Sequence, residues 1–319
     1  MENKPILLEV AFVRPILIVL LVAYHSFAIY CGAWQWPDMQ GSGNNAYFWI
    51  AKFSYSFMLE TFVFISGYVF AFQLISLNKR WSFKELLIKK IKRLILPSLF
   101  FSTVYQLFFY QQITIRKIID GTAHMWFLPM LFWCFVLSFF LVKIRRGFFV
   151  LFLLFLLAVF QNIHLPLQFH LTCYYLFFFY LAYVFYKNKI TLVNYKIIIL
   201  LWIGYLGFFV LYSCLQLNSA FFVKLFRLLS STFGVCALFF TSLFVVKQIR
   251  LKEWVIRFGG YCFGIYIFQQ FILQFLYYHT GFPQYVGELL LPWLGFILSL
   301  LFSFAIVYLL KKTKFGYYL

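Results

Sequence analysis

Long apolar runs recur along the whole chain, and short polar segments separate them. A membrane-spanning helix needs about 20 mostly apolar residues. The pattern therefore predicts an all-α polytopic integral membrane protein with about ten transmembrane helices, at residues 8–31, 47–77, 94–112, 124–142, 147–163, 169–186, 195–216, 221–246, 259–280 and 287–310. Because these runs continue from end to end, we expect residues 1–319 to form a single transmembrane domain.

The basic residues between the runs predict the orientation of the chain. Most of its 27 lysines and arginines fall after the second, fourth, sixth, eighth and tenth runs, whereas the opposite loops carry only Lys52, Arg116 and Lys117. Cytoplasmic loops of membrane proteins are enriched in Lys and Arg. We therefore expect both the N- and the C-terminus to lie in the cytoplasm.

Composition excludes a soluble protein and narrows the possible partners. The chain is 65% apolar and 11% charged, whereas a soluble domain averages about 45–50% apolar and about 25% charged. The formal net charge of +19 lies in short loops between apolar runs, so we expect contact with membrane lipid and none with nucleic acid. The six cysteines are scattered singly, which predicts neither a disulfide framework nor a metal site.

Arg14 and His25 are the sharpest candidates for chemistry, because ionisable residues inside a span are costly. Eleven residues bring a helix back to within about 20° of its starting direction, so both side chains share one face about 16 Å apart. A guanidinium can bind phosphate in bidentate fashion, and an imidazole can take up and return a proton. Alternatively, Arg14 reaches the membrane interface and His25 bonds to a neighbouring helix.

Glu60 is the acid placed most firmly inside a predicted span. A carboxylate can orient and charge-stabilise a catalytic imidazole, so Glu60 is a candidate partner for His25. It could equally pair with Arg14 or Lys52 in a purely structural role.

A basic segment with Lys89, Lys90, Lys92 and Arg93 precedes Pro97 at the cytoplasmic start of the third predicted span. Such a segment sets topology and attracts anionic lipid. It could also bind the phosphates of a nucleotide-bearing donor, and the two roles are compatible.

Three further polar positions could contact a ligand. Ser66, beside Gly67, could hydrogen-bond a ligand or serve close helix packing. His124 and Trp126 open the fourth span, where an aromatic residue is expected at the membrane interface. Trp126 could instead stack on a sugar ring.

Together these motifs resemble membrane-bound acyltransferase family 3, the bacterial glycan O-acyltransferases, along nearly the whole chain. The resemblance is carried by Arg14-x10-His25, Ser66-Gly67-Tyr68, Lys92-Arg93 with Pro97, His124-x-Trp126-Phe-Leu and Gly259-Gly-Tyr-Cys-Phe-Gly264-Ile-Tyr266-Ile-Phe-Gln269-Gln270. One departure is Gln269, near which members often carry histidine. Some relatives carry a fused soluble esterase-like domain, and we expect residues 1–319 to act without one.

The resemblance implies a ten-helix core that takes acyl-CoA, usually acetyl-CoA, from the cytosol. His25 would act on the thioester or the acceptor hydroxyl, with Arg14 on the donor path and Glu60 in support. Donor binding would involve Arg14, Ser66, Lys89, Lys90, Lys92 and Arg93, and substrate binding His124, Trp126, Tyr266 and Gln269.

The expected function is therefore O-acetylation of a polysaccharide or lipid-linked glycan of the capsule, exopolysaccharide or lipopolysaccharide type, at a bacterial inner membrane. A transporter or flippase for a lipid-linked saccharide would also explain ten spans with buried polar groups. A third alternative is an inactive scaffold in polysaccharide export, against which the presence of both Arg14 and His25 argues.

Overall fold

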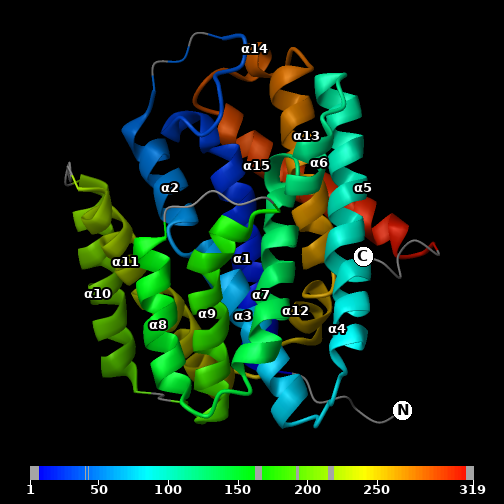
Figure 1. Cartoon of the computed structure of the whole chain (residues 1–319). Coiled ribbons are helices and arrows are strands. Elements are labelled where there is room, and N and C mark those ends of the chain that lie inside the picture. Colours follow the sequence, from blue (N-terminus) through cyan, green and yellow to red (C-terminus); the bar gives the residue numbers. More distant parts are fainter. Residues whose placement is uncertain are drawn as a thin grey trace. The chain divides into compact units, whose positions relative to one another are not determined.

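The computed structural model describes residues 7–39, 41, 43–161, 167–191, 194–214 and 219–313. All regular secondary structure in this part of the chain is helical (Figure 1). The chain divides into two compact units. Unit 1 comprises Met1–Met58 and Ile249–Leu319, and unit 2 comprises Leu59–Gln248.

Seven helices within the described ranges are long and apolar enough to cross a membrane. They are Leu8–Ser26, Asn45–Ile75, Ala123–Leu141, Phe169–Lys187, Tyr195–Cys214, Phe221–Gln248 and Leu291–Leu310. They correspond to seven of the ten predicted spans, so the multi-pass, all-helical class is confirmed. The third predicted span is interrupted, and the fifth and ninth form helices of only 14 and 17 residues. The total of about ten stays a prediction.

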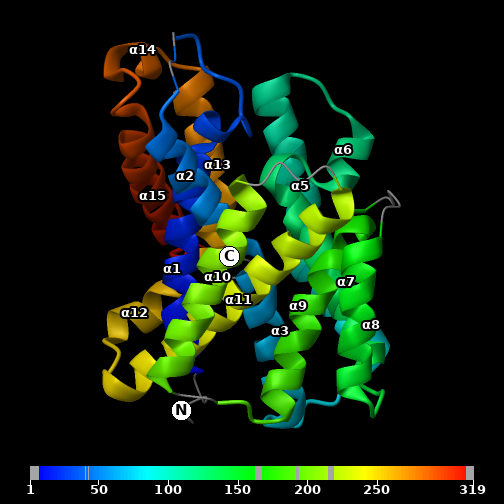
Figure 2. The ribbon, with the colours of Figure 1, turned by 90° about the vertical axis from the view of Figure 1, so that its left-hand side faces the viewer.

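Unit 1 is built around three long helices. Its elements are α1 (Leu8–Ser26), η1 (Ala28–Cys31), α2 (Asn45–Tyr55), α12 (Glu253–Phe258), α13 (Cys262–Tyr278), α14 (Phe282–Val286) and α15 (Leu291–Leu310). Helix α13 packs against both α1 and α15, and α1 also packs against α2 and α15 (Figure 2). The first predicted span ends early, because the chain tightens into η1 and then turns at Gly32, whose φ of 71° suits glycine.

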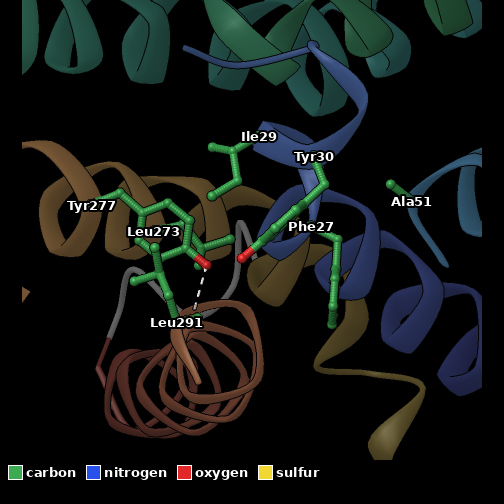
Figure 3. Close-up of a cluster of buried hydrophobic side chains, with 7 residues drawn as sticks. All are labelled: Phe27, Ile29, Tyr30, Ala51, Leu273, Tyr277 and Leu291. Atoms are coloured by element: carbon green, nitrogen blue, oxygen red, sulfur yellow. Dashed lines mark hydrogen bonds between the residues drawn. The ribbon is translucent and has the colours of Figure 1, made fainter. Parts of the chain in front are cut away.

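An aromatic cluster covers the end of α1 that carries His25. Phe27, Tyr30, Leu273, Tyr277 and Leu291 form its buried centre, together with Ile29 and Ala51 (Figure 3). The Tyr277 hydroxyl lies 2.9 Å from the carbonyl oxygen of Ser26 and 3.3 Å from that of Leu291. The hydroxyl of Tyr30 donates to the carbonyl of Glu288 at 2.6 Å. Buried tyrosines need such partners. Here Tyr277 ties the end of α1 to α13 and to the start of α15, and Tyr30 ties η1 to the segment before α15.

Unit 2 contains the remaining helices. They are α3 (Met58–Ile75), α4 (Phe83–Lys90), η2 (Ile91–Ile95), α5 (Leu96–Tyr105), η3 (Gln106–Tyr110), α6 (Ile115–Asp120), η4 (Ala123–Trp126), α7 (Phe127–Leu141), α8 (Gly147–Phe160), α9 (Phe169–Lys187), α10 (Tyr195–Cys214) and α11 (Ala220–Gln248). Helix α9 is buried without a break from Tyr175 to Val184, and α7 and α8 pack against it. A helix that is apolar on all sides is expected to be buried in this way.

Proline explains why the third predicted span is interrupted. Pro97 has no N–H to donate to the carbonyl of Arg93, four residues earlier. The chain forms the π-helical segment η2 at Ile91–Ile95 and resumes α-helical geometry in α5. A second π-helical segment, η3, ends at Tyr110, and the next residue, Gln111, has a φ of 50°. The basic residues Lys92 and Arg93 therefore lie on a widened helical turn.

Close packing of α3 on α9 makes Gly67 a sensitive position. A Cβ added at Gly67 would overlap the backbone carbonyl of Phe179, which cannot move as a flexible side chain can. We expect Gly67→Ala to destabilise the protein by about 1–3 kcal/mol, the usual cost of overpacking. Thermal unfolding in detergent, followed by light scattering or tryptophan fluorescence, measures the effect.

Gly207 in α10 supplies the matched control, because a Cβ there meets no described atom within 4 Å. Gly207→Ala should leave the melting temperature unchanged or raise it, since alanine favours helix over glycine. Equal melting temperatures for Gly67→Ala and the wild type would contradict the close contact between α3 and α9.

Candidate active site

Arg14 and His25 lie on one uninterrupted helix. Helix α1 runs from Leu8 to Ser26 and continues through Pro15. Eleven residues of α-helix place the Cα atoms of Arg14 and His25 about 16 Å apart on the same face. His25 lies in the last turn of α1 and Arg14 in its first half. The helix thus holds a guanidinium and an imidazole at a fixed separation.

His25 is buried among aromatic rings. Its side chain is 7% exposed, and its ring stacks on Trp34 with centroids 5.7 Å apart. The ring of Tyr24 is 5.1 Å away and itself stacks on Tyr55. The hydroxyl of Tyr278 donates to the carbonyl of Gln35 at 2.6 Å and so holds the loop that carries Trp34. The imidazole therefore has a restricted orientation, as a proton-transfer group needs.

Arg14 lies beside the turn that precedes α13. A Cβ added to Gly259 would be 4.0 Å from Cδ of Arg14. At the same turn, Nζ of Lys311 donates to the carbonyl of Gly260 at 2.6 Å and lies 4.1 Å from the ring centroid of Tyr261. Burial lowers the pKa of Lys311, and the neighbouring Cys262 partly offsets this lowering. Two cations, Arg14 and Lys311, thus flank one glycine turn.

The sequence did not indicate Lys311 as a site residue. There it was only one of the basic loop residues that predict the orientation of the chain. Its place beside Gly260 depends on how α15 packs against α13, and no spacing in the sequence encodes that.

Tyr266 and Gln269 lie on α13, the helix that packs against α1. Tyr266 is 7% exposed and Gln269 is fully buried. The hydroxyl of Ser299 in α15 donates to the backbone carbonyl of Gln269 at 2.9 Å, which leaves the Gln269 side chain out of that contact.

Glu60 lies in unit 2 and is 1% exposed. Its Oε1 accepts a hydrogen bond from the hydroxyl of Tyr174 at 3.1 Å, and that hydroxyl lies 3.3 Å from Oγ of Ser231. The guanidinium carbon of Arg227 is 5.2 Å from the centroid of the Tyr174 ring, and its charge attracts the carboxylate. Helices α3, α9 and α11 thus join a carboxylate, a phenol and a guanidinium.

The predicted partners of Glu60 were His25, Arg14 and Lys52, all of which lie in unit 1. These pairings join residues of different units and stay predictions. The partners that the structure provides, Tyr174 and Arg227, were missed. The signal that could have found these partners was Arg227 itself. It is a charged residue inside an apolar span, where charged residues rarely lack a partner.

His124 and Trp126 share the short helix η4. His124 is 5% exposed, and its ring lies 6.5 Å from that of Tyr105. The half-buried Trp126 lies 6.0 Å from Tyr175, the residue after Tyr174. Nε2 of Gln106 donates to Oγ1 of Thr122, the residue before η4, at 2.7 Å. This bond ties the start of η4 to η3.

The basic segment of unit 2 is only partly available to a ligand. Lys92 and Arg93 are exposed, and so is Lys89, whose Nζ lies 5.3 Å from the centroid of Trp81. Nζ of Lys90 lies 3.2 Å from the centroid of Phe135. Burial, followed by the charges of Arg93 and Lys89, lowers the pKa of Lys90 well below its usual range. Lys92 and Arg93 are thus the stronger candidates for binding an anion.

Ser66 uses its hydroxyl within its own helix. Its Oγ donates to the carbonyl of Phe62 at 2.8 Å, so only the lone pairs of the hydroxyl remain for a ligand. The predicted residues therefore form two groups: unit 1 holds Arg14, His25, Tyr266 and Gln269, and unit 2 holds Glu60, Ser66, Lys89, Lys90, Lys92, Arg93, His124 and Trp126.

Comparison with protein families identifies the chain. A family model described as an acyltransferase domain matches residues 8–312, a range that includes every predicted site residue. The chain belongs to membrane-bound acyltransferase family 3. Searches of curated proteins and of solved structures found no match. Membership of family 3 and the seven apolar helices together make the chain a multi-pass membrane acyltransferase.

Proposed function

We propose that this acyltransferase transfers an acyl group, in the first place acetyl, from cytosolic acyl-CoA to a hydroxyl of a glycan outside the cytoplasm. The acceptor is a polysaccharide or a lipid-linked glycan of the capsule, exopolysaccharide or lipopolysaccharide type. The protein would lie in a bacterial inner membrane, with about ten spans and both termini in the cytoplasm.

The observation that carries this proposal is the position of Arg14 and His25 on α1. One continuous helix holds them about 16 Å apart on one face, Arg14 beside a glycine turn with a second cation and His25 in an aromatic enclosure. An acyl-CoA has its phosphates at one end and its thioester at the other. The guanidinium of Arg14 is suited to bind the phosphates, and the imidazole of His25 is suited to transfer a proton at the thioester.

The reaction follows from these two positions. His25 takes the proton of a sugar hydroxyl as that oxygen attacks the thioester carbonyl. The new C–O ester bond forms, the C–S bond breaks, and the CoA thiolate leaves and recovers the proton from the imidazolium. In a variant of this scheme the acyl group is carried briefly on His25 before it reaches the sugar.

Glu60 is proposed to support catalysis electrostatically: its negative charge would stabilise the positive charge that develops during proton transfer. Its contacts with Tyr174 and Arg227 fix the carboxylate in place. Trp126 and His124 are proposed to contact the acceptor, and Lys92 and Arg93 the donor phosphates, since both cations are exposed.

Purified protein with radiolabelled acetyl-CoA tests the proposal. A membrane and glycan extract from cells that lack the gene serves as the acceptor. The expected result is consumption of thioester that depends on the extract, with label recovered in glycan. A protein that binds the extract but never consumes thioester would act as a transporter or flippase, and that outcome would refute the proposal.

A further inference from the structure

The side chain of Gln269 is a buried amide that forms no hydrogen bond within the part of the chain that the structure describes. Gln269 is 0% exposed, and neither Nε2 nor Oε1 has a partner among the described residues. The next residue, Gln270, is 5% exposed, and its Oε1 is likewise unpartnered there. A polar group buried in this way loses its hydrogen bonds to water without replacing them, which destabilises the fold. Two adjacent glutamines in an apolar helix therefore point to a ligand.

Helix α13 runs beside α1 and in the same direction (Figure 2). At one end, Cys262 lies within reach of the charge of Arg14. At the other end, the hydroxyl of Tyr277 donates to the carbonyl of Ser26, the residue after His25. These two contacts define the side of α13 that faces α1.

Gln269 and Gln270 lie on that side, between the two ends. Seven residues bring a helix back to within about 20°, so Gln269 points in the direction of Cys262 and Gln270 in that of Tyr277. Gln269 is about 12 Å along the axis from Tyr277 and about 10 Å from Cys262. Its amide therefore lies at an intermediate height between Arg14 and His25.

The donor in the proposed reaction carries groups that match this amide. The arm that joins the phosphates of CoA to its thioester contains two secondary amides, each with one N–H donor and one carbonyl acceptor. The side chain of glutamine offers both a donor and an acceptor. An arm held by its phosphates at Arg14, with its thioester at His25, passes Gln269.

We propose that Gln269, assisted by Gln270, hydrogen-bonds the amide-bearing arm of acyl-CoA between Arg14 and His25. This inference rests on the proposed acyl-CoA-dependent function. It assigns α13 to the donor path and gives Gln269 a binding role that needs no proton transfer.

Binding measurements with purified Gln269→Leu and three probes test the proposal. Acetyl-CoA carries phosphorylated adenosine and the arm, S-acetylpantetheine carries the arm without phosphates, and ADP carries phosphorylated adenosine without the arm. Gln269→Leu should weaken acetyl-CoA and S-acetylpantetheine by about tenfold and leave ADP unchanged. Arg14→Ala should show the opposite selectivity, with weaker acetyl-CoA and ADP but unchanged S-acetylpantetheine.

Ser303→Ala is the matched control. Ser303 is a fully buried residue of α15 whose hydroxyl also has no partner among the described residues. The Ser303→Ala substitution should leave the affinity for all three probes unchanged. Both Ser303→Ala and Gln269→Leu should maintain or raise the melting temperature, because each removes an unsatisfied polar group.

Two failures are distinguishable. If wild-type protein binds acetyl-CoA and Gln269→Leu binds it equally well, the assignment of Gln269 is wrong and the proposed function stands. If wild-type protein does not bind acetyl-CoA, the proposed function itself is wrong. An equal loss of affinity for all three probes in a folded Gln269→Leu protein would also overturn the assignment to the arm.

Discussion

Replacing His25 with alanine should reduce the rate of acyl transfer by about 10²–10⁴-fold, the contribution of a positioned general base. His25 is buried against Trp34 in the last turn of α1, so alanine removes both the proton acceptor and part of the aromatic packing. The rate of acetyl-CoA consumption by purified protein, with the membrane and glycan extract as acceptor, measures the effect. Binding of acetyl-CoA should change little, because the phosphates are assigned to the other end of α1.

Two further variants separate chemistry from folding. His25→Gln retains a polar side chain in place of the imidazole and should be about as inactive as alanine. His279→Ala changes an exposed histidine after α13 and should keep full activity. A His25→Ala protein that folds, binds acetyl-CoA and transfers acyl groups at the wild-type rate would exclude His25 as the base.

Replacing Arg14 with alanine should raise the KM for acetyl-CoA by roughly 10–100-fold, as expected when a charged hydrogen-bonding group is lost. The maximal rate at saturating donor should fall less, because His25 is unchanged. Arg14→Lys should recover only part of the affinity, since an ammonium cannot form the bidentate contact of a guanidinium. Steady-state kinetics at varied acetyl-CoA concentration distinguishes these effects.

Arg257→Ala is the control for Arg14. Arg257 lies in α12 within the same unit, but its guanidinium is exposed and pairs with Glu253 at 2.7 Å. An exposed pair of this kind contributes little to stability, and its loss should not change the KM. If Arg14→Ala lowers the maximal rate and leaves the KM for acetyl-CoA unchanged, Arg14 is not a donor-binding residue.

The sequence predicted the features that depend on local pattern. The apolar runs indicated the helical membrane class, and the spacing of Arg14 and His25 correctly placed both on one helix. Interruptions were harder to foresee. Pro97 was visible, but the π-helical segments on either side of α5 depend on how the freed backbone groups find partners.

Contacts between distant segments could not be predicted. Trp34 stacks on His25 because Tyr278 holds its loop, and Arg227 lies over Tyr174 because α9 and α11 adjoin. No regular spacing along the chain, such as that of a helical turn, brings the residues of either pair together. The lack of a partner for the Gln269 amide among the described residues is likewise a property of packing, although its place in an apolar helix was a visible signal.

The acetyl content of the cell-surface glycan tests the central claim most directly. Four strains are compared by NMR or by alkaline release of acetate: wild type, gene deletion, and deletion complemented with either wild-type protein or His25→Ala at equal membrane abundance. Acetyl groups should be present in the wild type, absent from the deletion, restored by wild-type protein and not restored by His25→Ala. Equal acetyl content in all four strains would contradict the assignment of glycan acylation to this protein.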